Sequence, residues 1–151
     1  MPGFRGTFEH SLDAKHRLTI PAKFRAALAG GVVLAATPEI DTDTPRAIGI
    51  WPTEVYEAYT AAVLADTHPF SAKARELNRF LFGLSHDTEL DGANRVMMPT
   101  SLMQYAGLSK DVVVTGSGQC LEIFDRAAYD AYSEGVLNRV QQIAASFDHT
   151  P

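Results

Sequence analysis

The stretch SLDAKHRLTIPAKFR, residues 11–25, decides how this sequence is interpreted. It places Asp13 and Arg17 four residues apart, then alternates Leu18 and Ile20 with polar neighbours and closes on Pro21. Such alternation is typical of a half-buried strand, and proline suits the first turn of a following helix. The stretch therefore predicts a turn, a strand and a short helix, and it raises the question of whether Asp13 and Arg17 carry out chemistry or fasten the turn.

The same pattern occurs again 78 residues later. LDAKHRLTIP (Leu12–Pro21) aligns with LDGANRVMMP (Leu90–Pro99), with Leu, Asp, Arg and Pro identical. At this offset LAAT (Leu34–Thr37) falls on VVVT (Val112–Thr115), whereas from Ile50 onward the offset is 73. We assign the difference to five extra residues in the Pro- and Asp-rich loop at 37–49. Each copy then predicts strand, turn, strand, short helix, strand, strand and long helix.

The repeat predicts two modules, at residues 7–54 and 83–126, with helical segments at 55–82 and 127–147. Gly30 and Gly107 are expected to end the short helices. Within residues 67–85, which have no counterpart in the second copy, we expect a further helix. The apolar stripes of the two long helices are interpreted as packing faces: Val55, Tyr56, Tyr59, Ala62 and Val63, and then Val136, Leu137, Val140, Ile143, Ala144 and Phe147.

Composition narrows the function classes. The 151 residues are 46% hydrophobic with no apolar run that would span a bilayer and no secretory signal, so a cytoplasmic protein is expected. The single cysteine, Cys120, excludes an intramolecular disulfide and is expected to be buried. The net charge of −5 argues against general nucleic-acid binding, but residues 1–28 alone carry +3 and the remainder −8. A local basic patch is what DNA binding requires.

Both turns, DAKHR and DGANR, need a residue that tolerates positive φ, and their fourth positions are His16 and Asn94. The Asp that opens each turn can accept hydrogen bonds from the backbone N–H groups ahead and can pair with the Arg that closes it. We interpret Asp13 and Asp91 as clamps of this kind.

The arginines have a second interpretation. A guanidinium on a two-stranded ribbon presents donors suited to phosphate or guanine. Arg17 lies beside Lys15 and near Lys23 and Arg25, so it ranks above Arg95 as a DNA contact.

FRGTFEHSLDAKHRLTIPAKFR together with ELDGANRVMMPTSLMQYAGL resembles the MraZ family of bacterial transcriptional regulators, which carry two tandem SpoVT-AbrB-like modules. The resemblance implies an α+β fold in which two swapped-hairpin modules interlock into a small pseudo-twofold β-barrel flanked by helices. It implies a ring-shaped homo-oligomer that binds repeats in double-stranded promoter DNA and regulates the division and cell-wall gene cluster. It also implies a nucleoid-associated protein without cofactor, metal, membrane contact or catalytic residues.

The family motif places DNA contacts on Arg17, Lys15 and Arg95, with Asp13 and Asp91 as supports. The sequence departs from the family where Gly usually precedes the motif Arg, since His16 and Asn94 stand there. The DNA-binding prediction therefore comprises Lys15, His16, Arg17, Lys23, Arg25 and Arg95, with the contribution of His16 left open.

Two alternatives remain. An enzyme could be assembled from acid/base groups and the thiol, but no nucleophile motif, phosphate loop or metal-ligand spacing accompanies them; the residues considered are Asp13, Asp91, His10, His16, His86 and Cys120. The second alternative is a module that binds only protein. A DNA-binding protein differs from such a module because its affinity for DNA falls steeply as the salt concentration rises.

Overall fold

The computed structural model describes residues 3–38 and 41–147, and its elements follow the predicted order. The first copy comprises β1 (Thr7–Ser11), β2 (Arg17–Thr19), η1 (Ala22–Phe24), α1 (Arg25–Leu28), β3 (Val32–Ala36), β4 (Ile48–Pro52) and α2 (Thr53–Leu64). The predicted insert helix is α3 (Ala72–Gly83), capped by the Ser71 hydroxyl. The second copy comprises β5 (Ser85–Thr88), β6 (Arg95–Met97), α4 (Thr100–Ala106), β7 (Asp111–Gly116), β8 (Leu121–Asp125) and α5 (Arg126–Ser146).

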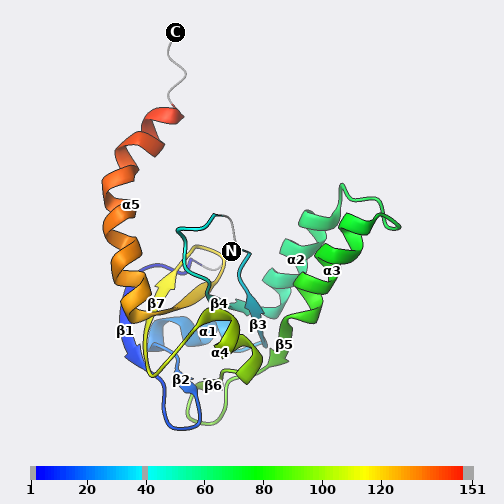
Figure 1. The fold of residues 1–151 in the computed structure, drawn as a ribbon. Coiled ribbons are helices and arrows are strands. Elements are labelled where there is room, and N and C mark those ends of the chain that lie inside the picture. The colour runs from blue at the N-terminus through cyan, green and yellow to red at the C-terminus, as the bar shows by residue number, and fades with distance from the viewer. Residues whose placement is uncertain (1–2, 39–40, 148–151) are drawn as a thin grey trace.

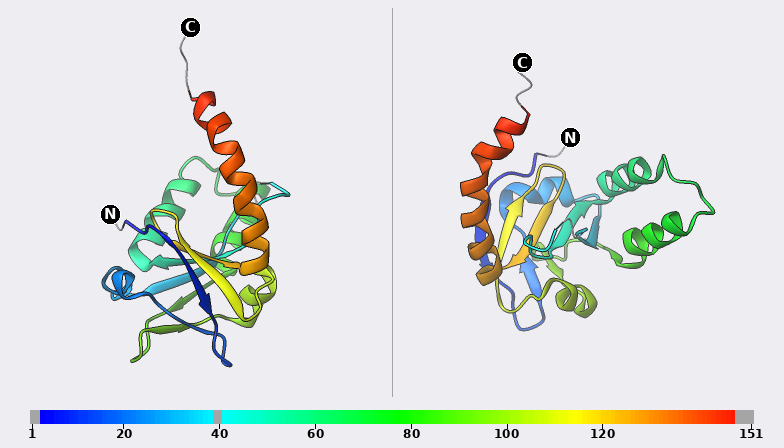
Figure 2. Two further views of the ribbon diagram at one scale, coloured as in Figure 1. Left: turned by 90° about the vertical axis from the view of Figure 1, so that its left-hand side faces the viewer. Right: turned by 45° about the horizontal axis from the view of Figure 1, so that its top comes forward.

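The strands form a six-stranded antiparallel sheet in the order β1-β7-β8-β4-β3-β5, and a separate ribbon of β2 and β6. Alternation along the sheet strands sends residues to two faces. Val32, Leu34 and Ala36 belong to the main core, together with the inner side of the ribbon and the short helices, whereas Val33 and Ala35 pack with Tyr56 of α2. The α2–α3 hairpin and α5 lie on opposite sides of the molecule (Figures 1 and 2).

Strand pairing exchanges elements between the two copies. β1 of the first copy pairs with β7 of the second, and β5 of the second pairs with β3 of the first. Leu18 pairs with its own counterpart Val96, and Gly49 with its counterpart Glu122. These two self-pairings define a pseudo-twofold axis through the ribbon and the sheet, and a single core cluster contains residues of both copies. Neither copy could bury its apolar face alone.

The register corrects one part of the repeat alignment. Pro52 pairs with Val32, and its counterpart Asp125 pairs with Val112, so β3 and β7 correspond at an offset of 80. The predicted offset of 78 for these strands is therefore wrong. The helix-to-strand connection is two residues longer in the second copy, and loop 37–47, of which 39–40 lie outside the described residues, exceeds its counterpart 117–120 by seven rather than five. The two-residue shift could not be seen in the sequence, because β3 and β7 are similar apolar runs and a shift by two residues keeps the same side chains on the inward face.

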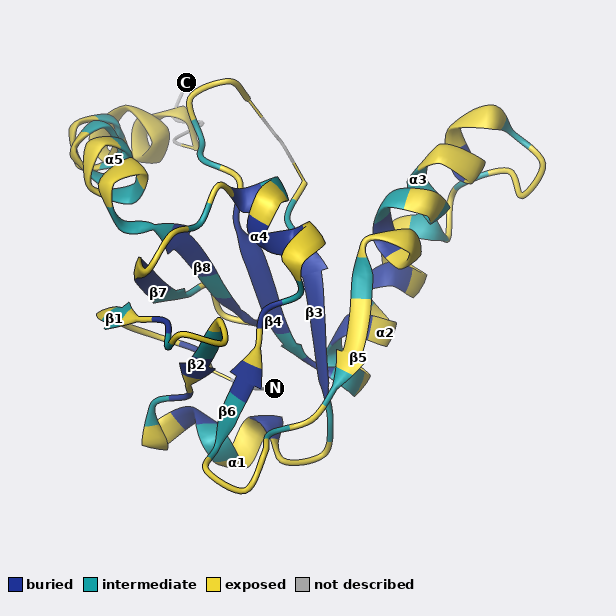
Figure 3. Cartoon of the chain, turned by 60° about the horizontal axis from the view of Figure 1, so that its bottom comes forward, coloured by how far each residue is buried: buried dark blue, intermediate teal, exposed yellow. Residues whose placement is uncertain are grey.

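The α+β class is confirmed, but the expected small β-barrel is not closed. The described sheet is open, with β1 and β5 as its two edges, and the β2–β6 ribbon lies apart from it. Closure would require these edges to pair, but the described pairings end at β1–β7 and β3–β5. The ribbon and the short helices cover the inner face of the sheet instead (Figure 3).

Two smaller expectations also differ. Gly107 ends α4 in the left-handed conformation as predicted, at φ 62°, but Ala29 rather than Gly30 caps α1, and Gly31 has the positive φ of 128°. The α5 stripe packs only at its start. Leu137 and Phe147 are 76% and 74% exposed, because α5 extends past the sheet (Figure 1). Within the described part of the chain, no helix combines the length and apolar content needed to cross a membrane.

Candidate nucleic-acid interface

The first turn is organised by the carboxylate of Asp13. Its Oδ1 accepts hydrogen bonds from the backbone N–H of Lys15 and of Arg17, both at 2.9 Å. Its Oδ2 accepts one from Nε of Arg17 at 2.7 Å. His16 has φ 59°, and its N–H donates to the Asp13 carbonyl. The predicted clamp and the predicted left-handed residue are therefore both confirmed.

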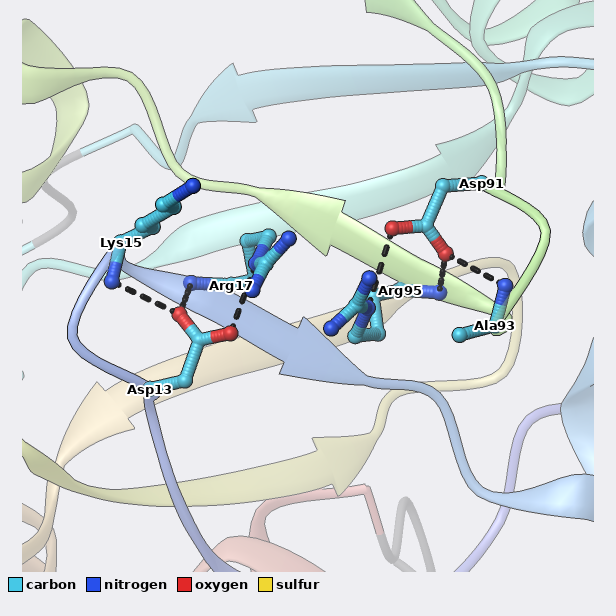
Figure 4. A network of polar contacts seen from close by, with 6 residues as sticks. All are labelled: Asp13, Lys15, Arg17, Asp91, Ala93 and Arg95. Atoms are coloured by element: carbon cyan, nitrogen blue, oxygen red, sulfur yellow. Dashed lines mark hydrogen bonds and ion pairs between the residues drawn. The ribbon is translucent and has the colours of Figure 1, made fainter.

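The second turn repeats this geometry. Asp91 Oδ1 accepts from the N–H groups of Ala93 and Arg95, both at 2.9 Å, and Oδ2 accepts from Arg95 Nε at 3.0 Å. Asn94 has φ 60°. Two unlike residues, His16 and Asn94, thus adopt one conformation because the Asp–Arg frame around them is the same (Figure 4).

The ribbon presents the two arginines together. Leu18 and Val96 point into the core with exposures of 0% and 2%, so Arg17, Thr19, Arg95 and Met97 lie on the outer face. Arg17 pairs with Met97 and Arg95 with Thr19, which makes the arginines diagonal neighbours across the pseudo-twofold axis. Diagonal residues on an antiparallel pair are about 7–8 Å apart. Figure 4 shows both guanidinium groups over the middle of the ribbon.

The clamps orient the guanidinium groups and leave donors free. Each Arg uses Nε for its Asp, and neither Arg17 nor Arg95 makes another side-chain hydrogen bond within the described residues. The backbone N–H of Arg17 is the main reason that the pKa of Asp13 lies below its usual value, and the backbone N–H of Arg95 does the same for Asp91. Both carboxylates therefore stay ionised at neutral pH. The four Nη groups remain available to an external acceptor.

The other predicted DNA-binding residues are in different settings. Lys15 and His16 are exposed on the first turn, next to Arg17. Lys23 is held over aromatic rings, with Nζ 5.1 Å from the ring centre of Phe8 and 5.0 Å from that of Phe24. Arg25 donates from Nε to the Ile20 carbonyl at 2.9 Å. Thus Lys15, His16, Arg17 and Arg95 share the ribbon and its turns, whereas Lys23 and Arg25 support the helix that follows.

Three residues near the ribbon were not singled out from sequence. Thr19 and Met97 belong to its outer face, and Met97 is 61% exposed. Because Thr19 and Met97 alternate with the apolar residues Leu18 and Val96, the sequence pattern would have indicated that they lie on the outer face of the ribbon. Lys110 borders a hollow beside Asp13 and His16, and its carbonyl accepts from Leu12 at 2.8 Å. Only strand pairing between the copies brings Lys110 there, so the sequence carried no signal for it.

The groups named for an enzyme are not brought into one site. Asp13 and Asp91 are occupied by their turns, and burial raises the pKa of the Cys120 thiol to about 12. Among the residues that the structure describes, no group of three or more His, Cys, Asp or Glu side chains could hold a metal ion.

Comparison with known proteins agrees with the repeat. The model of the MraZ protein family matches residues 4–80 and again residues 81–148. A transcriptional regulator MraZ of Anaeromyxobacter dehalogenans is 39% identical over 132 residues, which cover 84% of this chain and 87% of that protein. Those of Nitrosomonas eutropha and Mycoplasmoides gallisepticum are 37% and 30% identical, and cover 84% and 96% of this chain and 84% and 97% of their own lengths. The chain belongs to the MraZ family.

Proposed function

We propose that this protein is a DNA-binding transcriptional regulator whose β2–β6 ribbon enters the major groove. The relatives described above are named transcriptional regulators, which supports the regulatory part. The DNA-binding part is supported by one observation: two guanidinium groups, each oriented by its own Asp-clamped turn, lie together on a ribbon about a pseudo-twofold axis. The major groove of B-DNA is about 12 Å wide and admits a two-stranded ribbon.

In this proposal Arg17 and Arg95 contact guanine edges or phosphates, and Lys15 adds a phosphate contact to the first turn. An arginine used end-on through its Nη groups can bind the O6 and N7 atoms of guanine. Ala93 stands where the first turn has Lys15, so the second turn contributes less. His16 and Asn94 shape the turns. Lys23 and Arg25 act indirectly, because the structure engages both elsewhere.

We further propose two swapped-hairpin modules, residues 7–54 and 83–126, as the units of this scaffold. The exchange of β1 and β5 between the copies supports that description. The family resemblance supports a homo-oligomeric ring, which binds repeated sites in the promoter of its own gene and of the division and cell-wall cluster. A single ribbon offers few contacts, so simultaneous binding of several repeats would raise affinity through effective concentration.

Footprinting on the DNA upstream of the gene tests this function. Wild type should protect a series of short repeats, and protection should weaken steeply as salt rises, because counterions are released on phosphate binding. Arg17→Ala should lose specific protection while its oligomer mass is unchanged. No protection by the wild-type protein at low salt would reject the proposal and leave the protein-binding module.

A further inference from the structure

The pseudo-twofold axis relates two aromatic trios on the outer side of the sheet, under the long helices. Trp51, Tyr56 and Tyr59 form the first, with ring centres 4.7–6.1 Å apart. Their counterparts at the offset of 73 are Phe124, Tyr129 and Tyr132, with Phe124–Tyr129 at 5.0 Å and Tyr129–Tyr132 at 6.3 Å. Both trios consist of aromatic residues at equivalent positions, with Phe124 in place of Trp51, so they should need similar cover.

Only the first trio has this cover. Leu81 of α3 lies over it, the Tyr56 hydroxyl donates to the Leu81 carbonyl, and these two residues are 5% and 3% exposed. The cavity that remains has about 190 Å³. At the second trio, the residue equivalent to Leu81 at the offset of 78 is Gly3, which precedes β1, and no described helix from another part of the chain covers Tyr129. A groove of about 700 Å³ results there.

This groove, hereafter the α5 groove, lies between two walls. One wall is formed by β8 and α5, with Glu122, Phe124, Tyr129, Tyr132, Val136 and Leu137, and the other by the loop residues Thr37, Pro38, Asp41, Thr44 and Pro45. An apolar strip continues along α5 beyond it, where Val140 and Ile143 are 52% and 49% exposed. Contiguous exposed apolar surface of this kind marks an interaction site.

The groove also has a charge preference. Glu122 lines both this groove and the smaller cavity at the first trio, and its carboxylate makes no hydrogen bond within the described residues. Asp41, on the opposite rim, already accepts hydrogen bonds from Asp43 and Thr44 of its own loop, so the charge preference rests on Glu122. Desolvation raises the pKa of Glu122, a cost that a neighbouring cation would offset. A fitting occupant is therefore a helix that carries both aromatic and basic side chains.

The chain itself contains such a helix. On α3, residues Arg75, Arg79 and Phe82 follow at helical spacing, and all three are exposed, with Phe82 at 52%. This outer face is turned away from the buried side of α3, which carries Ala74 and Leu81. The α2–α3 hairpin and α5 project from opposite sides of the molecule, so one chain cannot join its own two surfaces (Figures 1 and 2).

We infer that the α5 groove binds the outer face of α3 from a second copy of this chain, with Phe82 against the aromatic trio and Arg79 toward Glu122. The contact joins two different surfaces, so each copy offers one α3 and one groove. Repetition of such a contact gives a closed ring or an open filament. The inference deepens the assembly part of the proposed function, and it assigns the surfaces independently of DNA.

Complementation of two blocked variants tests this contact, with masses measured by light scattering without DNA. Phe82→Asp/Arg79→Glu blocks α3, and Leu137→Asp/Val140→Asp blocks the groove strip; all four side chains are exposed, so the fold should be retained, as circular dichroism can verify. Each variant alone should be monomeric, whereas an equal mixture should give a 1:1 heterodimer and nothing larger. Only a head-to-tail contact between unlike surfaces gives that result.

Phe70→Asp is the matched control, since Phe70 is 87% exposed in the α2–α3 connection and outside both surfaces; it should assemble like wild type. Glu122→Gln should weaken assembly without abolishing it. Wild-type mass for the α3 variant, or a mixture that stays monomeric, would overturn the inference. If a variant loses assembly but keeps weak DNA binding that depends on the ribbon, the DNA-binding proposal stands. If the protein assembles normally but does not bind DNA, only the DNA-binding proposal is rejected.

Discussion

Gly116→Ala should destabilise the protein because the backbone of the N-terminal segment passes directly over this position. A Cβ at residue 116 would lie 2.4 Å from the Phe4 carbonyl carbon and 2.5 Å from the Arg5 nitrogen, far inside contact distance. Its counterpart is Ala36, whose Cβ fits because residue 82, the counterpart of Phe4, is half-exposed on α3 instead of packed inward. The glycine is thus required at a place where the two copies pack differently.

The magnitude follows from what the displaced segment would lose. Phe4 is 1% exposed, its ring lies 5.4 Å from that of Phe24, and its backbone makes two 3.0 Å hydrogen bonds with Gly118. Burial of a phenylalanine stabilises by about 1.5–3 kcal/mol, and overpacking costs a similar amount. We expect a loss of about 2.5 kcal/mol, which for a chain of this length lowers Tm by roughly 5–10 °C.

Thermal unfolding followed by circular dichroism measures this effect. Gly92→Ala is the matched control, because a Cβ there meets nothing within 4 Å, and its Tm should stay level or rise slightly. In a Phe4→Ala background, Gly116→Ala should cost much less, since both changes disturb the same contact. A Tm of Gly116→Ala within 2 °C (about 1 kcal/mol or less) of wild type would refute the reasoning.

Three further predictions concern the turns and the cysteine. His16→Gly should keep specific DNA affinity and change stability by less than about 1 kcal/mol, because relief of left-handed strain and the entropy of glycine nearly cancel; a large loss of affinity in fluorescence anisotropy would show that the imidazole itself contacts DNA. The lowered pKa values of Asp13 and Asp91 stabilise the fold above about pH 3.9, the unfolded value, and this contribution disappears as pH falls through the lower folded values. The free energy of unfolding, measured with urea, should therefore fall less between pH 4 and pH 2 for the Asp13→Asn/Asp91→Asn variant than for wild type. An equal fall in both proteins would contradict the clamps. With a pKa of about 12, the Cys120 thiol should be roughly one part in ten thousand thiolate at pH 8, so Ellman's reagent should react only on unfolding, and rapid labelling of the native protein would disprove its burial.

The local parts of this structure could be predicted from sequence, and the parts that depend on the other copy could not. His16, Asn94 and the Asp–Arg clamps are interactions within five residues, and each was foreseen. The 80-residue offset of β3 and β7 depends on which distant strands pair, and both strands look alike in sequence. The open sheet is likewise a property of edges that meet or fail to meet in three dimensions.

The site shows the same division. The spacing of Asp13 and Arg17 predicts their turn, but the diagonal placement of Arg17 and Arg95 follows only from the β2–β6 register. Lys23 and Arg25 are basic residues close in sequence to the motif, yet aromatic rings and a carbonyl already engage them. The apolar stripe of α5 was predicted as a packing face, and most of it remains exposed among the residues that the structure describes.

The most direct test of the account is a titration of the upstream DNA with wild type, Arg17→Ala and Arg95→Ala by fluorescence anisotropy at several salt concentrations. Lys73→Ala, which removes an exposed charge from α3, is the control. A bidentate base contact contributes about 1–3 kcal/mol, so each ribbon variant should bind specific DNA at least fivefold more weakly, with the larger loss for Arg17. The control should bind like wild type. Equal affinity of all four proteins for the specific DNA would contradict the assignment of the ribbon as the DNA-binding surface.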